Sequence, residues 1–390
     1  MSSVAEETGV AGDWTTLDGS QQRVAVEVLR HGPLPRAELA RRLGLSPGSL
    51  TRLTRPLVDS GLLVEGTSDI HTRTGRPSLP LDVQPSSRRF IGVKITGDAL
   101  FAVVTDLRAA VLAEHEAPLP GRGPEAVVDA VTDAVARMRG EHGEVAGLGV
   151  GIGGRVSERR DVTKAQFLGW QETVPLAARL QSATGLPTVV ENDVRALTVA
   201  EHWFGAGRGL QSLVVVTIGV GVGCGIVVHD RLVEGAHGAG GSVGHRPLPG
   251  WAMCAQGHRG CAEAVLTSGA ITAAVGQALG RSVTYDEVLE LAGAGQPAAR
   301  RAVADAGRAL GLLVADIAGL VDPDLVILTG EGVGAVDIAR AELAAALEES
   351  RDPAGPQIRV DVQPFPFTEW ARGAAAVAVQ AHVLGPAAPV

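Results

Sequence analysis

Residues 36–60, which read RAELARRLGLSPGSLTRLTRPLVDS, decide the fold of the amino-terminal part of the chain. Residues 36–43 have the spacing of a short amphipathic helix, and Gly44 supplies the tight turn that follows it. Ser46 and Pro47 have the chemistry of an N-cap and a first helical residue, so a second helix begins there. Pro56 lacks a backbone donor and is expected to kink or tighten this second helix. The segment therefore predicts a helix-turn-helix.

The flanking residues complete a small domain. Residues 21–31 carry a mostly apolar helical face and end in a glycine and a proline, which indicates a preceding helix. Residues 62–65 and the segment that returns to Leu81 read as two strands joined by a turn, which is the pattern of a β-wing. We therefore expect a winged helix-turn-helix domain over residues 20–82, preceded by a disordered arm over residues 1–19.

Charge is distributed unevenly along the chain. Residues 20–80 contain nine arginines and five acidic residues, for a net charge of +4. The whole chain has a net charge of −9, so the remainder carries −13. A basic head on an acidic body is typical of a small DNA-binding domain attached to a larger sensor.

Double-stranded DNA is therefore the expected partner of the head. Polar and basic side chains near the start of the second helix are placed to enter a major groove, and arginines of the wing to reach phosphates or a minor groove. The candidate DNA contacts are Arg36, Ser49, Thr51, Arg52, Arg55, Arg73 and Arg76. The alternative is a protein-interaction module whose surface arginines are merely solvated.

The body has a different pattern from about residue 90. Apolar strands separated by glycines alternate with alanine-rich helices, which predicts an α/β architecture with its boundary near residues 82–89. No apolar run is long enough to cross a bilayer, so no membrane partner is expected. Three cysteines in 390 residues cannot form a disulfide framework, which favours a reducing, cytoplasmic location.

Five segments of the body together resemble the ROK family (repressor, open reading frame, kinase). They are residues 190–193, 219–225, 238–245, 254–263 and 328–332. The resemblance implies a two-lobed, actin-like (RNase H-like ATPase) sugar-kinase fold. Lobe 1 is expected over residues 90–195, completed by a helix near 370–385, and lobe 2 over residues 196–369 with a sugar and zinc loop. The implied sugar contacts are Gly154, Asn192, Asp193, His245 and Glu263.

Several positions depart from the family pattern. The family kinases have Asp-x-Gly-Gly-Thr after the first strand, where this chain has Lys94 and Asp98, and the second phosphate loop has Val220 in place of threonine. A carboxylate at Asp98 repels phosphate. We expect no ATP binding and no catalytic residue, with Asp193 a vestigial base, although Lys94 contacting a phosphate keeps an ATP-dependent sugar kinase as the alternative.

Two sugar-site features also remain open. Ser242 stands where the family sugar binders have glutamate, and Gly153 stands where they more often have proline. The pair Asn192-Asp193 matches the family's sugar contact and base, but Asn-Asp after a strand is also ordinary turn chemistry. We expect an altered sugar specificity, a larger or modified ligand, or weakened binding.

The metal site implied by the resemblance is incomplete. His245, Cys254 and Cys261 match three zinc ligands, and Gln256 replaces the fourth, a cysteine. His258 offers a substitute nitrogen, which would give the two cysteines and two histidines of a tetrahedral site. The alternative is a metal-free loop with two free cysteines.

The leading hypothesis is a sugar-responsive transcription regulator, a repressor, with a degenerate kinase domain as its sensor. It is expected to act as a homodimer or tetramer on operator DNA, with a sugar or sugar phosphate as effector. A third hypothesis is a DNA-binding scaffold that responds to no small ligand.

Overall fold

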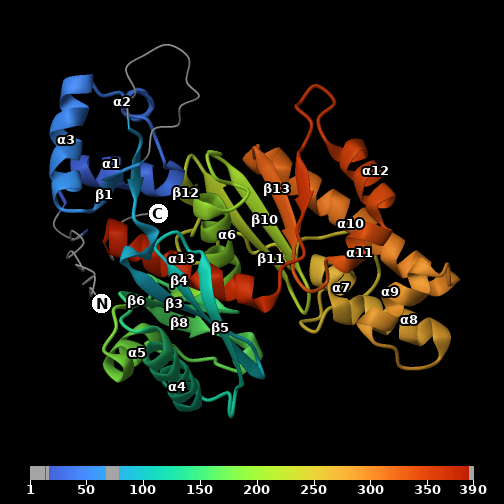
Figure 1. Cartoon of the computed structure of the whole chain (residues 1–390). Coiled ribbons are helices and arrows are strands. Elements are labelled where there is room, and N and C mark those ends of the chain that lie inside the picture. Colours follow the sequence, from blue (N-terminus) through green and yellow to red (C-terminus); the bar gives the residue numbers. More distant parts are fainter. Residues whose placement is uncertain (1–13, 15–16, 67–78, 386–390) are drawn as a thin grey trace, which may run out of the picture.

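The computed structural model describes residues 14, 17–66 and 79–385. Its head contains the helices α1 (Gly19–His31), α2 (Arg36–Leu43) and α3 (Pro47–Asp59), and an antiparallel pair of strands, β1 (Leu63–Glu65) and β2 (Leu81–Val83) (Figure 1). Gly44 ends α2 in the left-handed conformation, with φ of 64°, and the Ser46 hydroxyl caps α3 by accepting the backbone N–H of Ser49. The winged helix-turn-helix is confirmed. The α3 helix continues through Pro56.

The expected disordered arm over residues 1–19 includes ordered residues among those that the structure describes. The carboxylate of Asp18 accepts the backbone N–H groups of Ser20 and Gln21 and forms a capping box at the start of α1. The Trp14 side chain is buried in the hydrophobic cluster of the head. Chain order therefore begins before the helix, because the cap and the apolar contact both lie upstream of it.

Lobe 1 is built on a five-stranded sheet with the order β5-β4-β3-β6-β9. The strands are β3 (Arg89–Ile95), β4 (Ala99–Asp106), β5 (Val111–Pro118), β6 (Gly147–Ile152) and β9 (Thr188–Asn192), and a 3-10 turn, η2 (Pro85–Ser87), precedes them. The helices α4 (Pro124–His142) and α5 (Leu176–Thr184) cover one face of the sheet, and α13 (Phe367–Leu384) covers the other. A small hairpin, β7 (Arg155–Ser157) with β8 (Asp161–Lys164), leads into the 3-10 turn η3 (Gln166–Leu168).

Alternation along β3 explains this layering. Ile91, Val93 and Ile95 point toward the α4 and α5 side, so residues 92 and 94 point toward α13. A β-carbon at Gly92 would lie 2.0 Å from the Ala371 carbonyl oxygen, so only glycine lets α13 pack this closely.

Lobe 2 contains a second five-stranded sheet with the order β12-β11-β10-β13-β14. The strands are β10 (Leu213–Ile218), β11 (Val222–Val228), β12 (Arg231–Leu232), β13 (Leu325–Thr329) and β14 (Val360–Val362). The helices of this lobe are α7 (Ala262–Leu266), α8 (Ser268–Leu279), α9 (Tyr285–Gly293), α10 (Pro297–Val321), α11 (Gly334–Ile338) and α12 (Arg340–Ser350). The mixed α/β, two-lobed fold expected for the body is confirmed.

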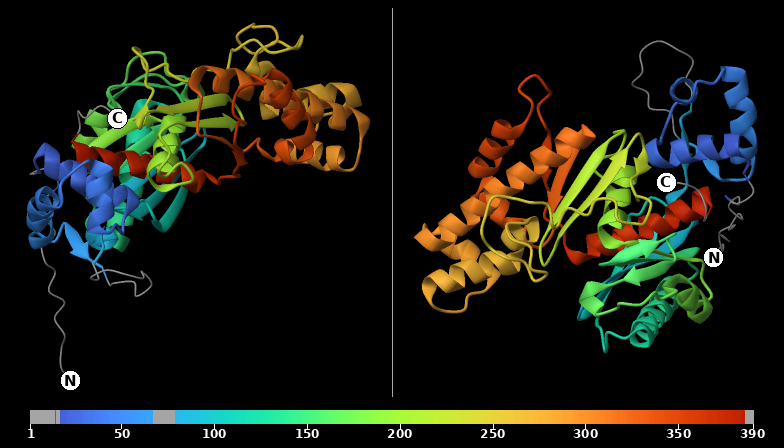
Figure 2. Two further views of the ribbon diagram at one scale, coloured as in Figure 1. Left: turned by 90° about the horizontal axis from the view of Figure 1, so that it is seen from above. Right: turned by 180° about the vertical axis from the view of Figure 1, so that it is seen from behind.

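The helices α6 (Asp193–Phe204) and α13 lie between the two sheets (Figures 1 and 2). The division expected after residue 195 falls within α6, and the completing helix expected near residues 370–385 corresponds to α13, which packs on the lobe 1 sheet. The head packs on the body through a shared apolar cluster that includes Leu29, Trp203 and Val379. Among the described residues, no helix is both long and apolar enough to span a membrane.

Candidate functional site

The first group of site residues gathers where β9 meets α6. The Asn192 side chain caps α6 by accepting the backbone N–H of Arg195 at 3.1 Å. Its Nδ2 donates to the carbonyl oxygen of Gly154 at 2.9 Å and to Oδ1 of Asp193 at 3.3 Å. Gly154, Asn192 and Asp193, three of the five predicted sugar contacts, therefore lie together at the end of the lobe 1 sheet.

A buried ion pair joins Lys94 to Asp193 at this point. The Lys94 ammonium donates to Oδ2 of Asp193. The residues are only 7% and 8% exposed, and the ammonium also lies over the Trp370 ring at 5.1 Å. From the sequence, the alternative role expected for Lys94 was contact with a phosphate. The ion pair with Asp193 was not predicted. A lysine inside an apolar strand was the available signal, because a buried charge requires a counter-charge.

The second glycine loop, at the turn between β10 and β11, also has an internal partner. The backbone N–H of Val220 donates to Oε1 of Glu331 at 2.8 Å. The Glu331 carboxylate lies directly over Gly219, since a β-carbon at residue 219 would be 2.1 Å from its Cδ. Asp98 is exposed and accepts the Thr96 hydroxyl at 2.9 Å. The two loops that depart from the kinase pattern therefore each have a carboxylate beside them, Asp98 at the first loop and Glu331 at the second.

The second group of site residues lies in lobe 2, where His245, Cys254 and His258 have ligand atoms within 4.8 Å of one another. The Cys254 sulfur is 3.5 Å from Nδ1 of His258 and 3.9 Å from Nδ1 of His245, and the Cys261 sulfur is 3.8 Å from Nδ1 of His245. Ligand atoms around a tetrahedral zinc ion are about 3.5 to 3.8 Å apart, as its bond lengths require. His245, Cys254 and His258 therefore have spacings that suit a metal ion, and Cys261 lies beside His245.

Glu263 belongs to this second group. Its Oε2 lies 3.8 Å from Nδ1 of His245, and its backbone N–H donates to the Gly244 carbonyl at 2.8 Å. Within the described residues, no hydrogen bond or ion pair joins His245 or Glu263 to Asn192 or Asp193. The structure thus places the predicted sugar contacts in two groups, one on each lobe.

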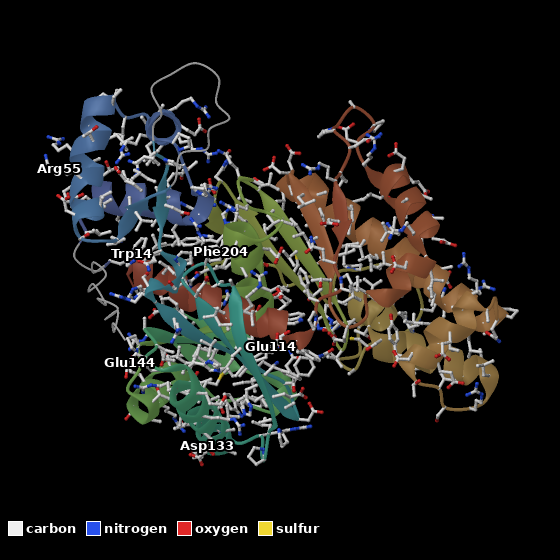
Figure 3. The ribbon with its side chains drawn as sticks, viewed as in Figure 1. Trp14, Arg55, Glu114, Asp133, Glu144 and Phe204 are labelled. Carbon is white, nitrogen blue, oxygen red and sulfur yellow. The ribbon has the colours of Figure 1, made fainter. Side chains whose placement is uncertain are left out.

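The candidate DNA contacts lie on the outer face of α3. Thr51, Arg52 and Arg55 are exposed, and Figure 3 shows Arg55 pointing away from the body. Ser49 shares a hydrogen bond with the capping Ser46 hydroxyl at 2.9 Å. Arg36 instead donates to Glu65 at 2.6 Å, at the base of the wing. Arg73 and Arg76 lie outside the described residues.

The junction that joins the end of α1 to the body was not predicted from the sequence. Nη2 of Arg30 lies 3.0 Å from Oδ1 of Asp230, in the β11–β12 turn, and 3.2 Å from Nε2 of His202, in α6. Arg108 of lobe 1 donates to the carbonyl oxygens of Val28 and Leu29 at 3.1 Å. Hydrogen bonds from His202 and Arg30 lower the pKa of Asp230 to about 2. Both lobes therefore hold the same helix end.

Comparison with known proteins places these features in context. The ROK family model matches residues 90–380, and a model described as winged helix-turn-helix DNA-binding matches residues 18–64. A glucokinase of Streptomyces coelicolor is 34% identical over 259 residues, covering 62% of this chain and 81% of the relative. The DNA-binding transcriptional dual regulator NagC of Escherichia coli K12 is 27% identical over 318 residues, covering 77% of this chain and 78% of NagC.

Solved structures give the same two kinds of neighbour. A ROK family transcriptional regulator, a homolog of the E. coli MLC protein, superposes with a TM-score of 0.79 at 24% identity, covering 94% of this chain and 96% of that one. A ROK family glucokinase from Streptomyces griseus, in complex with glucose and AMPPNP, gives 0.66 at 28% identity, covering 75% and 99%. The match to the regulator covers 94% of this chain, which is more than residues 90–390 can supply, so it extends into the head.

Proposed function

This chain belongs to the ROK family, and we propose that it is a DNA-binding transcription regulator, a repressor, whose kinase-like body senses a sugar or sugar phosphate. The observation that carries the proposal is the α3 helix, which exposes Thr51, Arg52 and Arg55 on one face of a winged helix-turn-helix. The side chains of such a helix reach base edges in a major groove. A regulator of this kind acts as a homodimer or tetramer on paired half-sites and works in the cytoplasm, where the DNA is.

Phosphoryl transfer is disfavoured by the cleft residues. A general base must accept a proton from the sugar hydroxyl, but the Asp193 carboxylate is already paired with the Lys94 ammonium. The Val220 amide, which would face a phosphate, is bonded to Glu331. The test is ADP release over a panel of hexoses, N-acetylhexosamines and pentoses. Turnover that is lost in Asp193→Asn would establish the kinase alternative.

Sensing requires a connection between the cleft and the head, and α6 supplies one. Its first turn carries Asp193, and its last turn carries His202, which contacts Arg30 of the head. An effector shifts DNA affinity only by as much as its own affinity differs between the DNA-binding state of the protein and the state that does not bind DNA. Because lobe 1 and lobe 2 both hold the end of α1, a change in the angle between the lobes changes the position of the head.

We also propose that the lobe 2 cluster holds a zinc ion through His245, Cys254, His258 and Cys261. The clustering of His245, Cys254 and His258, with the Cys261 sulfur 3.8 Å from Nδ1 of His245, supports this assignment. Zinc would fix the loop between residues 245 and 261 and so hold Glu263 in place. In this assignment His258 takes the place of the ligand missing at Gln256.

The proposal is tested with DNA from upstream of the chain's own gene. We expect binding that weakens steeply with salt, since basic residues displace counterions from phosphates. Addition of the effector sugar should change the affinity. A scaffold without an effector would bind DNA equally well with every sugar of the panel, and a protein-interaction module would not bind it at all.

A further inference from the structure

The turn that carries Phe167 is rigidly anchored in lobe 1. Ala165 and Trp170 exchange backbone hydrogen bonds of 3.2 and 3.0 Å, and Leu168 and Trp170 are buried. The Trp170 indole N–H donates to the carbonyl oxygen of Arg122 at 2.6 Å. Phe167 lies between these anchors but is 46% exposed. Its aromatic ring is therefore presented to solvent by a backbone that is already ordered.

The ring lies beside the Asp193 carboxylate. A β-carbon at Gly153 would lie 2.9 Å from Cδ2 of Phe167 and 3.4 Å from Oδ2 of Asp193, so the ring and the carboxylate flank the same point at the end of β6. On its other side, Cζ of Phe167 lies 3.8 Å from the β-carbon position of Gly221 in lobe 2. The ring thus stands between the lobes, next to Asn192 and Asp193, which are predicted sugar contacts.

The absence of a side chain at residue 153 fits this position. Any side chain there would collide with the Phe167 ring. The exposed aromatic face beside Asp193 favours a ligand that offers apolar surface.

We infer that Phe167 is a specificity-determining residue that stacks on the C–H face of the sugar ring while Asn192 and Asp193 bind hydroxyls at its edge. The inference rests on the proposed sugar sensing. Pyranoses that present an unbroken C–H face, or carry an apolar substituent on it, are the preferred ligands. Because the ring is held in place before binding, little conformational entropy opposes the contact.

The experiment measures sugar binding by calorimetry for the full chain and for Phe167→Ala, Phe167→Trp and Leu112→Ala. The probes are D-glucose, N-acetyl-D-glucosamine, D-xylose and phenyl β-D-glucopyranoside. We expect Phe167→Ala to weaken the tightest probe by about tenfold or more, and Phe167→Trp to retain most of the affinity, because stacking and burial of apolar area are lost only in the first. Leu112, which is also exposed but lies on the edge strand β5, is the matched control and should change nothing.

The outcomes separate this inference from the proposed function. Equal affinity of Phe167→Ala and the unchanged chain for a bound sugar overturns the stacking role but leaves sensing intact. Failure of every probe to bind the unchanged chain overturns the stacking role, whereas operator binding without sugar tests the DNA-binding function separately. A fall in the melting temperature of sugar-free Phe167→Ala that is large enough to account for its loss of sugar affinity would show a structural role instead.

Discussion

Replacing Lys94 with methionine should destabilise the protein by leaving the Asp193 carboxylate buried without its counter-charge. The Lys94 and Asp193 side chains are only 8% and 11% exposed. Breaking a buried ion pair by removing one partner costs about 3–5 kcal/mol. Oδ1 of Asp193 keeps its bonds from Asn192 Nδ2 and the Val194 N–H. We therefore expect a loss at the lower end of that range, about 3 kcal/mol at neutral pH.

Urea unfolding of Lys94→Met, Asp193→Asn and the double variant measures the coupling free energy between the two side chains. Each single variant leaves one buried charge unpaired, whereas the double variant leaves none. The double variant should therefore lose less than the sum of the single losses, by about 2 kcal/mol or more. Additive losses, or a Lys94→Met loss below about 1 kcal/mol, would refute the reasoning.

Four further predictions concern the head, its junction and the metal cluster. Burial and nearby arginines lower the pKa of His31 to about 4. The head should therefore lose at most about 3 kcal/mol of stability as the pH falls from 6.5 toward 4. Thermal unfolding of His31→Gln should lack this pH dependence. Asp230→Asn should leave sugar affinity unchanged in calorimetry while reducing the effect of sugar on DNA affinity. His258→Ala should lower the zinc content measured by atomic emission, whereas Gln256→Ala should not. Arg52→Ala should weaken operator binding and, if it contacts phosphate, reduce the salt slope by about one.

The head was readily predicted because its signals are local. Ser46, Pro47 and Gly44 act on their immediate neighbours, and a capping hydroxyl or a left-handed glycine has the same effect in most folds. The start of α1 was missed because Asp18 and Trp14 lie in a polar stretch, and the contact that buries Trp14 is made by residues distant in sequence.

The contacts of Lys94, Asp193 and the second glycine loop were only partly predictable because they are not local. Lys94 and Asp193 are 99 residues apart and meet because β3 and β9 flank β6. Glu331 reaches Val220 across 111 residues because the strands that precede them, β13 and β10, are parallel neighbours. The family resemblance suggested a metal site that includes Cys254, with His258 as a substitute ligand, but only the folded loop shows that the ligand atoms of these two residues approach to 3.5 Å.

Fluorescence anisotropy of labelled operator DNA tests the central claim most directly. Labelled DNA from upstream of the chain's own gene is titrated with the full chain at two salt concentrations and then with the sugar panel. The account predicts tight binding at low salt, weaker binding at high salt, and release of the DNA by at least one sugar. Absence of binding at low salt would contradict the account.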